Sequence, residues 1–431
     1  MNSAEIRQKH SAHLFPAVKN FYQVPLVITE GQGIQVTDAD GNQYLDFFGG
    51  ILTVSVGHAN EEVNAAIVAQ VNRLSHVSTL YQVESVVQLA EKLAHITPGK
   101  LEKCFFTASG TEADETAVMM AQVYTGKGEF IALRHAYSGR SLLAQSLTAH
   151  ASWRALPTQV AAVKHALAPY CYRCPLKSSY PDCGVGCAQD VEELIRTTTT
   201  GEIAGMMVEP IQGVGGFITP PPEYFQIVAE IVRHYGGIFI SDEVQTGFGR
   251  TGKMFGIEQY GVVPEMMTMA KGIANGLPLG AVITTGEIAD SLVKNSISTF
   301  GGNPVSCAAA NKTMEIVERD NLTENCSTMG KLLRQELERL QQKYPKIIGD
   351  VRGMGLMQAL ELVLDETSHD RTPNPKALDQ LMEETRQRGL LIGRGGLYGN
   401  VVRISPPMNV TREPVEKAVR ILDDSLAALS N

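Results

Sequence analysis

Short apolar runs alternate with amphipathic segments over residues 61–284, and this alternation limits the folds that the chain can adopt. The stretch KCFFTASGTEADETAVMMAQVYTG predicts a strand at residues 104–106, a turn, and a helix that ends at Gly126. The stretch PPEYFQIVAEIVRHYGGIFISDEV predicts a helix, a Gly-Gly break and a buried strand. Such alternation is typical of βαβ units around a mostly parallel sheet.

The pattern changes near Thr313. A long helix in NCSTMGKLLRQELERLQQKY is followed by IGDVRGMGLMQALELV, a further helix, and a short β stretch at VVRISPP. A chain of 431 residues is also too long for one ordinary core. We therefore expect a large α/β domain and a smaller α+β domain.

Charge and hydropathy narrow the range of partners. The net charge of −9 argues against nucleic acid or an anionic membrane as a main partner. The sequence has no apolar run long enough for a membrane span, and its start, MNSAEIRQKHSAHLFP, lacks the apolar core of a signal peptide. We expect a cytoplasmic protein.

Four of the seven cysteines crowd into CYRCPLKSSYPDCGVGC, as C-x2-C, a gap of eight residues, and C-x3-C. Two close thiol pairs suit tetrahedral zinc or disulfides, although the gap is shorter than in common zinc ribbons. Free thiols in a surface insertion are the alternative. The sequence leaves this choice open for Cys171, Cys174, Cys183 and Cys187.

The segment from Gly247 to Lys253 has the outline of a phosphate-binding P-loop. A working P-loop needs Ser or Thr after the lysine to hold Mg²⁺, and a helix whose N-terminus faces the phosphates. Met254 follows the lysine here, and the next residues, FGIEQYGVVPE, form a poor helix. We interpret the match as accidental.

A better anion site lies in TASGTEADETAVMM, where a strand ends and a helix begins. Free N–H groups in the first turn of a helix bind phosphate, and the hydroxyls of Ser109 and Thr111 would add donors around Gly110. The alternative is a capping box, in which these hydroxyls only cap the helix. The stretch alone does not separate the two.

Asp242 lies just past a predicted buried strand, in SDEVQ, and Lys271 ends a short predicted apolar strand, in MAKGI. A lysine in apolar surroundings titrates low and becomes a usable amine nucleophile, whereas a surface lysine would have no such role. A carboxylate buried at a strand end needs a positive counter-charge, which a protonated heteroaromatic nitrogen can supply. Phosphate turn, aspartate and lysine in this order indicate pyridoxal phosphate as the cofactor.

The blocks SDEVQTGFGRTG and MAKGIANGLPLGAV closely resemble the class III aminotransferases, which are fold-type-I pyridoxal phosphate enzymes. YLDFFGGILTVSVGH, SGTEADE, EPIQGVGG, STFGGNP and VVRISPP extend the resemblance over nearly the whole chain, most like the alanine–glyoxylate aminotransferase 2 type. The resemblance implies an α/β large domain with a mostly parallel sheet flanked by helices at residues 49–315. It also implies a small α+β domain built from residues 1–48 and 316–431.

The resemblance also implies roles for residues at matching positions. Lys271 would attach the cofactor and shuttle the proton, and Asp242 would pair with the pyridinium nitrogen. Arg403 would clamp the substrate carboxylate, and Glu209 would act as a gating acid that pairs with an arginine. The remaining cofactor contacts would be Ser109, Gly110 and Thr111 at the phosphate, Tyr137 and Val244 on the two ring faces, and Gln245 at the phenolic oxygen.

Thr299 in STFGGNP would reach the phosphate of a neighbouring subunit, which implies a homodimer with shared active sites, or a dimer of dimers. Two positions depart from the family pattern. Ser138 stands where the family usually has His, and Asp114 where it usually has Asn. Neither change removes a catalytic group, but Ser138 can reshape the pocket.

The resemblance implies ping-pong transfer of an amino group from an amino acid or ω-amine to an α-keto acid. Alanine, β-alanine and 4-aminobutyrate are candidate donors, and glyoxylate, pyruvate and 2-oxoglutarate are candidate acceptors. Side chains that could decide between donors are Ile51, Thr53, Tyr81 and Trp153. The alternatives are an amine phospho-lyase, a decarboxylating transaminase, and a non-catalytic zinc-binding interaction protein.

Overall fold

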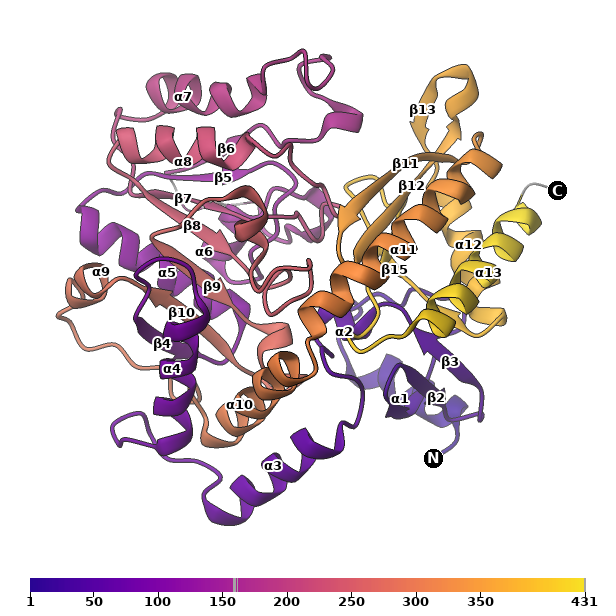
Figure 1. Cartoon of the computed structure of the whole chain (residues 1–431), viewed down its shortest axis with the longest axis horizontal. Helices are drawn as coiled ribbons and strands as arrows, with labels where there is room; N and C mark the ends of the chain where they lie inside the picture. The colour runs from indigo at the N-terminus through magenta and orange to yellow at the C-terminus, as the bar shows by residue number, and fades with distance from the viewer. Residues whose placement is uncertain (158–159, 161, 430–431) are drawn as a thin grey trace.

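The computed structural model describes residues 1–157, 160 and 162–429, which form three β-sheets and the helices packed on them (Figure 1). The largest sheet has seven strands in the order β4-β10-β9-β8-β7-β5-β6. Strands β9, β8, β7, β5 and β6 are parallel, whereas β10 runs antiparallel to both β4 and β9. The prediction of a mostly parallel sheet is confirmed. The strands are β4 (Lys103–Thr107), β5 (Phe130–Leu133), β6 (Val163–Ala166), β7 (Gly205–Val208), β8 (Ile238–Asp242), β9 (Met266–Met269) and β10 (Gly280–Thr284).

Helices cover both faces of this sheet, which explains why the five strands between its edge strands are buried along their whole length. Phe239 in β8 packs in a core with helices on one face, among them α4, α7 and α8, whereas Ile238 and Ile240 pack in a second core with α5 on the other. Figure 1 shows the helices α7 and α8 stacked beside this sheet. The helices of this part are α3 (Glu61–Arg73), α4 (Glu84–Ile96), α5 (Gly110–Thr125), α6 (Leu142–Leu147), α7 (Gly186–Thr198), α8 (Tyr224–His234), α9 (Gly286–Asp290) and α10 (Pro304–Arg319).

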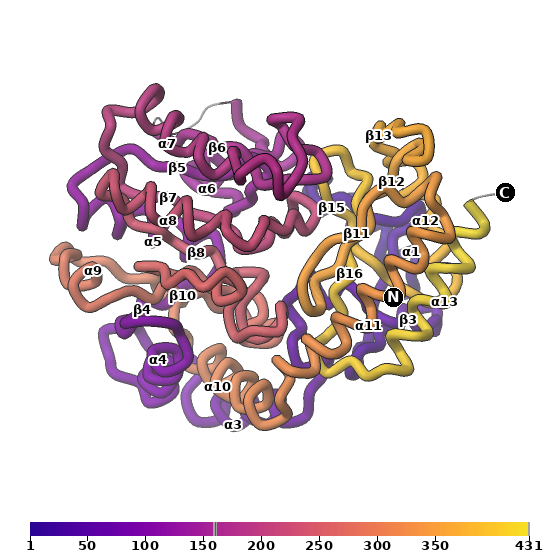
Figure 2. The backbone as a smooth tube through the Cα atoms, turned by 45° about the horizontal axis from the view of Figure 1, so that its top comes forward, coloured from indigo at the N-terminus to yellow at the C-terminus, as the bar shows by residue number. Residues whose placement is uncertain are grey.

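The two ends of the chain fold together. Strand β14 (Leu390–Leu391) pairs in parallel with β3 (Gln43–Asp46), so a C-terminal strand completes an N-terminal sheet. Leu45 and Phe47 share a core with Leu333 of α11 and Leu422 of α13. Figure 2 shows the indigo N-terminal segment running among the orange and yellow C-terminal elements. The predicted association of these two segments therefore has a physical basis in one shared core.

The remaining elements complete this smaller part of the molecule. Its second sheet has the order β11-β12-β16-β15, with β13 paired to β12. The predicted boundary after residue 315 falls inside α10, and the domain limits stay a prediction. The elements are α1 (Ser3–His13), β1 (Ile28–Gln32), β2 (Gln35–Asp38), α2 (Gly49–Leu52), α11 (Leu322–Lys343), β11 (Ile348–Met354), β12 (Met357–Asp365), β13 (Asp370–Pro373), α12 (Pro375–Gln387), β15 (Gly393–Gly395), β16 (Val401–Ile404) and α13 (Arg412–Leu429).

The cysteine-rich segment docks onto the second sheet through a buried ionic cluster. Glu361 of β12 accepts hydrogen bonds from Tyr170, Arg173 and Arg352, although the first two lie far from it in sequence. The four clustered cysteines are free thiols that line a small cavity of about 20 Å³. Within the described ranges, no group of three or more cysteine, histidine or acidic side chains is arranged to hold a metal ion.

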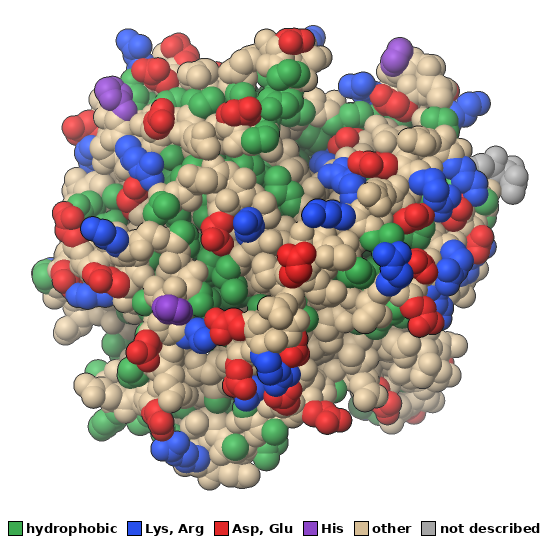
Figure 3. Space-filling view, in the orientation of Figure 1, with side chains coloured by type: hydrophobic (Ala, Val, Ile, Leu, Met, Phe, Trp, Pro, Cys, Tyr) green, Lys and Arg blue, Asp and Glu red, His purple; other side chains and the backbone are tan. Residues whose placement is uncertain are grey.

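The surface carries both signs of charge. On the face shown in Figure 3, acidic and basic side chains are interspersed, as 46 acidic and 37 basic residues lead one to expect. Among the residues that the structure describes, every helix is too short or too polar to cross a bilayer.

Candidate active site

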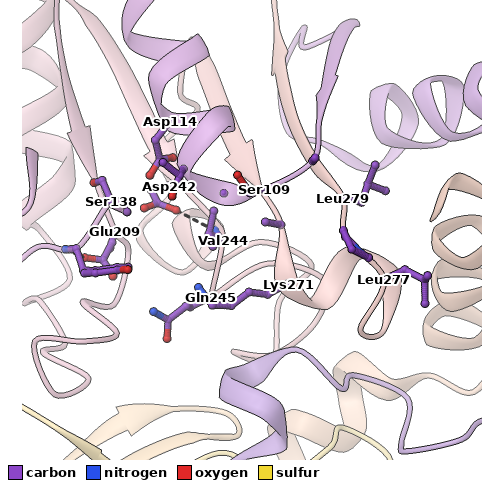
Figure 4. Close-up of a pocket in the computed structure, with 17 residues that line it drawn as sticks. Ser109, Asp114, Ser138, Glu209, Asp242, Val244, Gln245, Lys271, Leu277 and Leu279 are labelled. Carbon is purple, nitrogen blue, oxygen red and sulfur yellow. Dashed lines mark hydrogen bonds between the residues drawn. The ribbon is translucent and has the colours of Figure 1, made fainter. Parts of the chain in front are cut away.

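One cavity of about 310 Å³ gathers the loops that follow several of the central strands (Figure 4). Its walls include every residue predicted for the site except Thr299 and Arg403. The predicted residues on these walls are Ser109, Gly110, Thr111, Tyr137, Glu209, Asp242, Val244, Gln245 and Lys271.

The N-terminus of α5 forms one wall of the cavity. Ser109 Oγ accepts a hydrogen bond from Glu112 N at 3.2 Å, so Ser109 does cap the helix. The first-turn residues Gly110 and Thr111 also line the cavity, so their N–H groups are placed to receive an anion. A Cβ at Gly110 would lie 3.2 Å from Val244 Cγ1, and glycine therefore keeps this wall open. The two interpretations of this stretch, cap and anion site, are compatible.

Asp242 ends β8 and is 4% exposed. Its Oδ1 accepts a hydrogen bond from Val244 N at 3.0 Å. Burial raises the pKa of Asp242 to about 6, and the nearby charge of Lys271 opposes that rise. The carboxyl is therefore largely ionised at neutral pH and can serve as a counter-ion for a cationic ring nitrogen.

Glu243, the acid next to Asp242, has a different role. Its carboxylate accepts hydrogen bonds from Ser241 Oγ, Thr246 Oγ1 and the N–H groups of Gly256 and Ile257. These contacts tie down the loop that outlines a P-loop. That loop leads into a short 3₁₀ helix, Gly256–Tyr260, and not into an α-helix that could receive a phosphate.

Lys271 follows β9 and begins a short 3₁₀ turn with φ of +46°. It is partly accessible from the cavity, yet burial of its surroundings lowers the pKa of its amine. The charges of Asp242, Glu209 and Asp114 oppose this shift. A lowered pKa increases the fraction of neutral amine, which is the form that attacks a carbonyl carbon.

Glu209 lies just beyond β7 and is 6% exposed. Its Oε1 accepts from Tyr137 N at 3.1 Å and its Oε2 from Gly213 N at 2.8 Å. Burial, followed by the charge of Asp242, raises the pKa of Glu209 to about 8. Glu209 is therefore mostly neutral at pH 7 despite its two backbone hydrogen bonds.

Arg403 lies in β16 and is 4% exposed. It donates to Arg394 O at 2.9 Å and to Gly213 O at 3.3 Å. Its guanidinium lies over the rings of Phe48 and Phe217, at 4.8 and 5.6 Å from their centroids. These contacts fix the guanidinium near the site but outside the set of cavity-lining residues.

Thr299 lies on an exposed segment outside the cavity wall, and its predicted contact with a neighbouring subunit stays a prediction. Among the residues considered for donor choice, Trp153 packs edge-on against Tyr137, with ring centroids 5.3 Å apart. Ile51 and Tyr81 are exposed.

Sequence reasoning did not place several cavity residues. Asp114 and Ser138 were visible only as departures from a family pattern, and both line the cavity. Residues 277–279, which complete one side, directly follow the lysine turn in GLPLGA. Their closeness in sequence to Lys271 is the signal that could have identified them.

The cavity fits pyridoxal phosphate on its own chemistry. It offers an amine of lowered pKa, a buried carboxylate, a helix N-terminus, and the side chain of Gln245, whose Oε1 has no hydrogen-bond partner among the described residues. These groups match an aldehyde, a ring nitrogen, a phosphate and a phenolic oxygen.

Comparison with known proteins agrees with this chemistry. The family model for class III aminotransferases matches residues 17–426. The chain is 41% identical to alanine–glyoxylate aminotransferase 2 homolog 2 of Arabidopsis thaliana, over 98% of this chain and 87% of that protein. It is 34% identical to the solved (S)-enantioselective omega-transaminase of Thermomicrobium roseum, with a TM-score of 0.92 over 100% of both chains.

A solved amine transaminase from an uncultivated Pseudomonas species, described as PLP-bound, is 33% identical, with a TM-score of 0.88 over 94% of this chain and 95% of that one. The cofactor of this protein is accordingly pyridoxal phosphate, and the fold is that of the pyridoxal phosphate-dependent transaminases. The chain belongs to the class III aminotransferase family.

Proposed function

We propose that the protein transfers the amino group of alanine, or of a short ω-amino acid such as β-alanine or 4-aminobutyrate, to an α-keto acid. Glyoxylate, pyruvate and 2-oxoglutarate are the candidate acceptors. The observation that carries this proposal is the shared contact of Glu209 and Arg403 with Gly213. The Arabidopsis relative, whose name states an alanine–glyoxylate reaction, supports alanine and glyoxylate among these substrates.

Each side chain around the cavity would have its own role in the proposed reaction. Pyridoxal phosphate supplies, when bound, an aldehyde that captures the amine and a ring that accepts the electrons released at the substrate carbon. Lys271 would anchor the cofactor, and its freed Nζ would then take the proton from that carbon and deliver it to the former aldehyde carbon of the cofactor. Asp242 would hold the ring nitrogen in its protonated form, and the N-terminus of α5 would hold the phosphate.

Arg403 would select substrates with a carboxylate, because its buried fork binds planar anions well. The charge of Glu209 would control whether Arg403 can bind a substrate carboxylate. Neutral Glu209 leaves Arg403 free for an α-carboxylate, whereas ionised Glu209 attracts the arginine and repels a second carboxylate. A single cavity could in this way accept both α-amino acids and ω-amines.

Half-reaction spectra would test the proposal. Each donor is added alone to the loaded enzyme, and the change of the cofactor's absorbance is recorded against donor concentration. Rapid conversion by alanine, followed by recovery of the spectrum and formation of glycine on adding glyoxylate, is the expected result. Rapid conversion only by amines that lack a carboxylate would refute the proposed substrates.

We further propose that the active unit is a homodimer. Residues near Thr299 and the segment around Tyr81 lie together, since the rings of His76 and Phe300 are 5.5 Å apart. The two segments carry large exposed apolar side chains, a feature that often marks a protein interface: Leu80, Tyr81, Val293, Ile297 and Phe300. Sedimentation equilibrium should give twice the chain mass, and a monomer that retains full activity would refute the shared site.

A further inference from the structure

Asp114 is a buried carboxylic acid to which the proposed reaction assigns no task. It lies in α5, is 2% exposed, and lines the cavity. Its Oδ1 has no hydrogen-bond partner among the described residues. Figure 4 shows Asp114 directly beside Asp242, on the side away from Lys271. A buried, unpaired carboxyl oxygen is costly, so its presence at this cavity calls for a physical explanation.

Thr268 connects the two acids. It lies in β9, fully buried, directly across from Asp242 in the strand register. Its Oγ1 has no hydrogen-bond partner among the described residues, and β9 packs against α5, the helix that carries Asp114. Asp114, Thr268 and Asp242 are thus three buried oxygen-bearing side chains on adjoining elements, here called the Asp114–Thr268–Asp242 chain.

The charges around Asp114 do not allow all of the acids to ionise. The titratable groups that face it are Asp242, Glu209, Lys271 and Tyr137, so three carboxyls share one amine. Burial and the negative charge of Asp242 raise the pKa of Asp114 well above its ordinary value. Asp242, by contrast, has its pKa raised only to about 6. When two close carboxyls compete in this way, one holds the proton and the other stays ionised.

We propose that Asp114 is protonated in the working enzyme and donates a hydrogen bond to Thr268 Oγ1, which leaves the Thr268 hydroxyl proton for Asp242. A hydroxyl has only one proton to donate. If Asp114 were ionised, it would compete with Asp242 for that proton. With Asp114 protonated, every donor in the chain points towards Asp242, which stays the anion. Asp114 is thus a positioning residue that acts on the cofactor through Asp242, whichever amino donor the enzyme uses.

The first test uses the cofactor-free protein and the near-isosteric substitution Asp114→Asn. A group whose folded-state pKa is raised gives stability that is present below its ordinary pKa and lost as pH rises through the folded pKa. Wild type should lose this stability, whereas the Asn variant, which cannot titrate, should not. Denaturant titrations give the unfolding equilibrium constants of wild type and of Asp114→Asn. The ratio of these two constants should shift about tenfold per pH unit between the pKa of Asp114 in the unfolded chain and its pKa in the folded protein.

A ratio that stays constant from about pH 5 to about pH 9 would overturn the proposal, because it would mean that Asp114 ionises normally. No substrate is present in this experiment. Its outcome is therefore independent of the proposed donors and acceptors.

The second test compares Thr268→Val with Thr268→Ser. Valine keeps the shape of threonine and removes the hydroxyl, whereas serine keeps the hydroxyl. Equilibrium titration of the cofactor-free variants with pyridoxal phosphate should show about tenfold weaker binding for Val and binding within about twofold of wild type for Ser. Equal affinities of the two variants for pyridoxal phosphate would show that the Thr268 hydroxyl does not act on Asp242, and the proposal would fail.

Discussion

Glu209 and Arg403 are held by opposite ends of the same residue. The N–H of Gly213 donates to Glu209 Oε2 at 2.8 Å, and its carbonyl oxygen accepts from Arg403 Nη1 at 3.3 Å. The two side chains come from different parts of the fold, since Glu209 follows β7 of the large sheet and Arg403 lies in β16 of the second sheet. A change in the charge of Glu209 can therefore reach the arginine through one residue.

Replacing Arg403 with lysine should selectively weaken reactions of substrates that carry a carboxylate. Lysine keeps the charge but loses the planar fork, so we expect kcat/KM for alanine to fall about 100-fold. For an amine without a carboxylate, the fall should stay below about threefold. The exposed pair of Arg388 with Glu384 offers a control, since Arg388→Lys should leave both values near those of wild type. Equal losses for the two substrates would contradict the assignment.

The pH dependence of substrate binding should reveal Glu209. Because its pKa is raised to about 8, it is neutral below that pH and ionised above it. We expect KM for an α-keto acid to rise as pH increases through about 8, since ionised Glu209 repels the carboxylate and competes for Arg403. Glu209→Gln should give a flat profile over this range. A profile of the Gln variant that still rises with the same midpoint would assign the titration to another group.

The size of residue 213 should matter to the cofactor as well as to the substrate. A Cβ at Gly213 would overlap the side-chain amide of Gln245, which lines the cavity. Gly213→Ala should therefore weaken pyridoxal phosphate binding about tenfold or more, measured by equilibrium titration. Gly128→Ala is the matched control, since a Cβ there meets nothing within 4 Å. Similar affinities for the two variants would mean that the loop relaxes freely around the added methyl group.

Glu243 should prove to be a structural residue despite its place next to Asp242. Glu243→Ala leaves two hydroxyls and two N–H groups without their acceptor, so we expect a loss of about 3 kcal/mol in the free energy of unfolding. Urea titration measures this loss. The exposed Glu230 on α8 serves as control, with an expected change within about 0.5 kcal/mol. A loss for Glu243→Ala no larger than that of the control would contradict the structural role.

Local signals in the sequence predicted much of the fold. The helix after Ser109 ends at Thr125 and is capped by Gly126 in a left-handed conformation, as the turn chemistry indicates. Asp242 and Lys271 could be identified because Asp242 ends a strand and Lys271 follows one closely, and the ends of parallel strands meet at one edge of a sheet. These features depend on neighbours in the chain, which is why a single sequence reveals them.

Contacts between distant segments were beyond the reach of such patterns. The antiparallel placement of β10 between β4 and β9 depends on pairings that no local period encodes. The cluster of Tyr170 with Glu361 joins residues 191 positions apart. Asp114 was hidden for the same reason, because an acid near the start of a helix is usually a favourable surface residue and only the packed sheet makes it a buried one.

The assignment of Lys271 as the point of covalent cofactor attachment is the central claim, and borohydride reduction followed by peptide mass mapping tests it most directly. The loaded enzyme should carry a stable reduced adduct on the peptide containing Lys271, and the Lys271→Ala variant should carry none. An adduct on another lysine, such as the exposed Lys253, or no adduct on freshly loaded enzyme, would contradict the account.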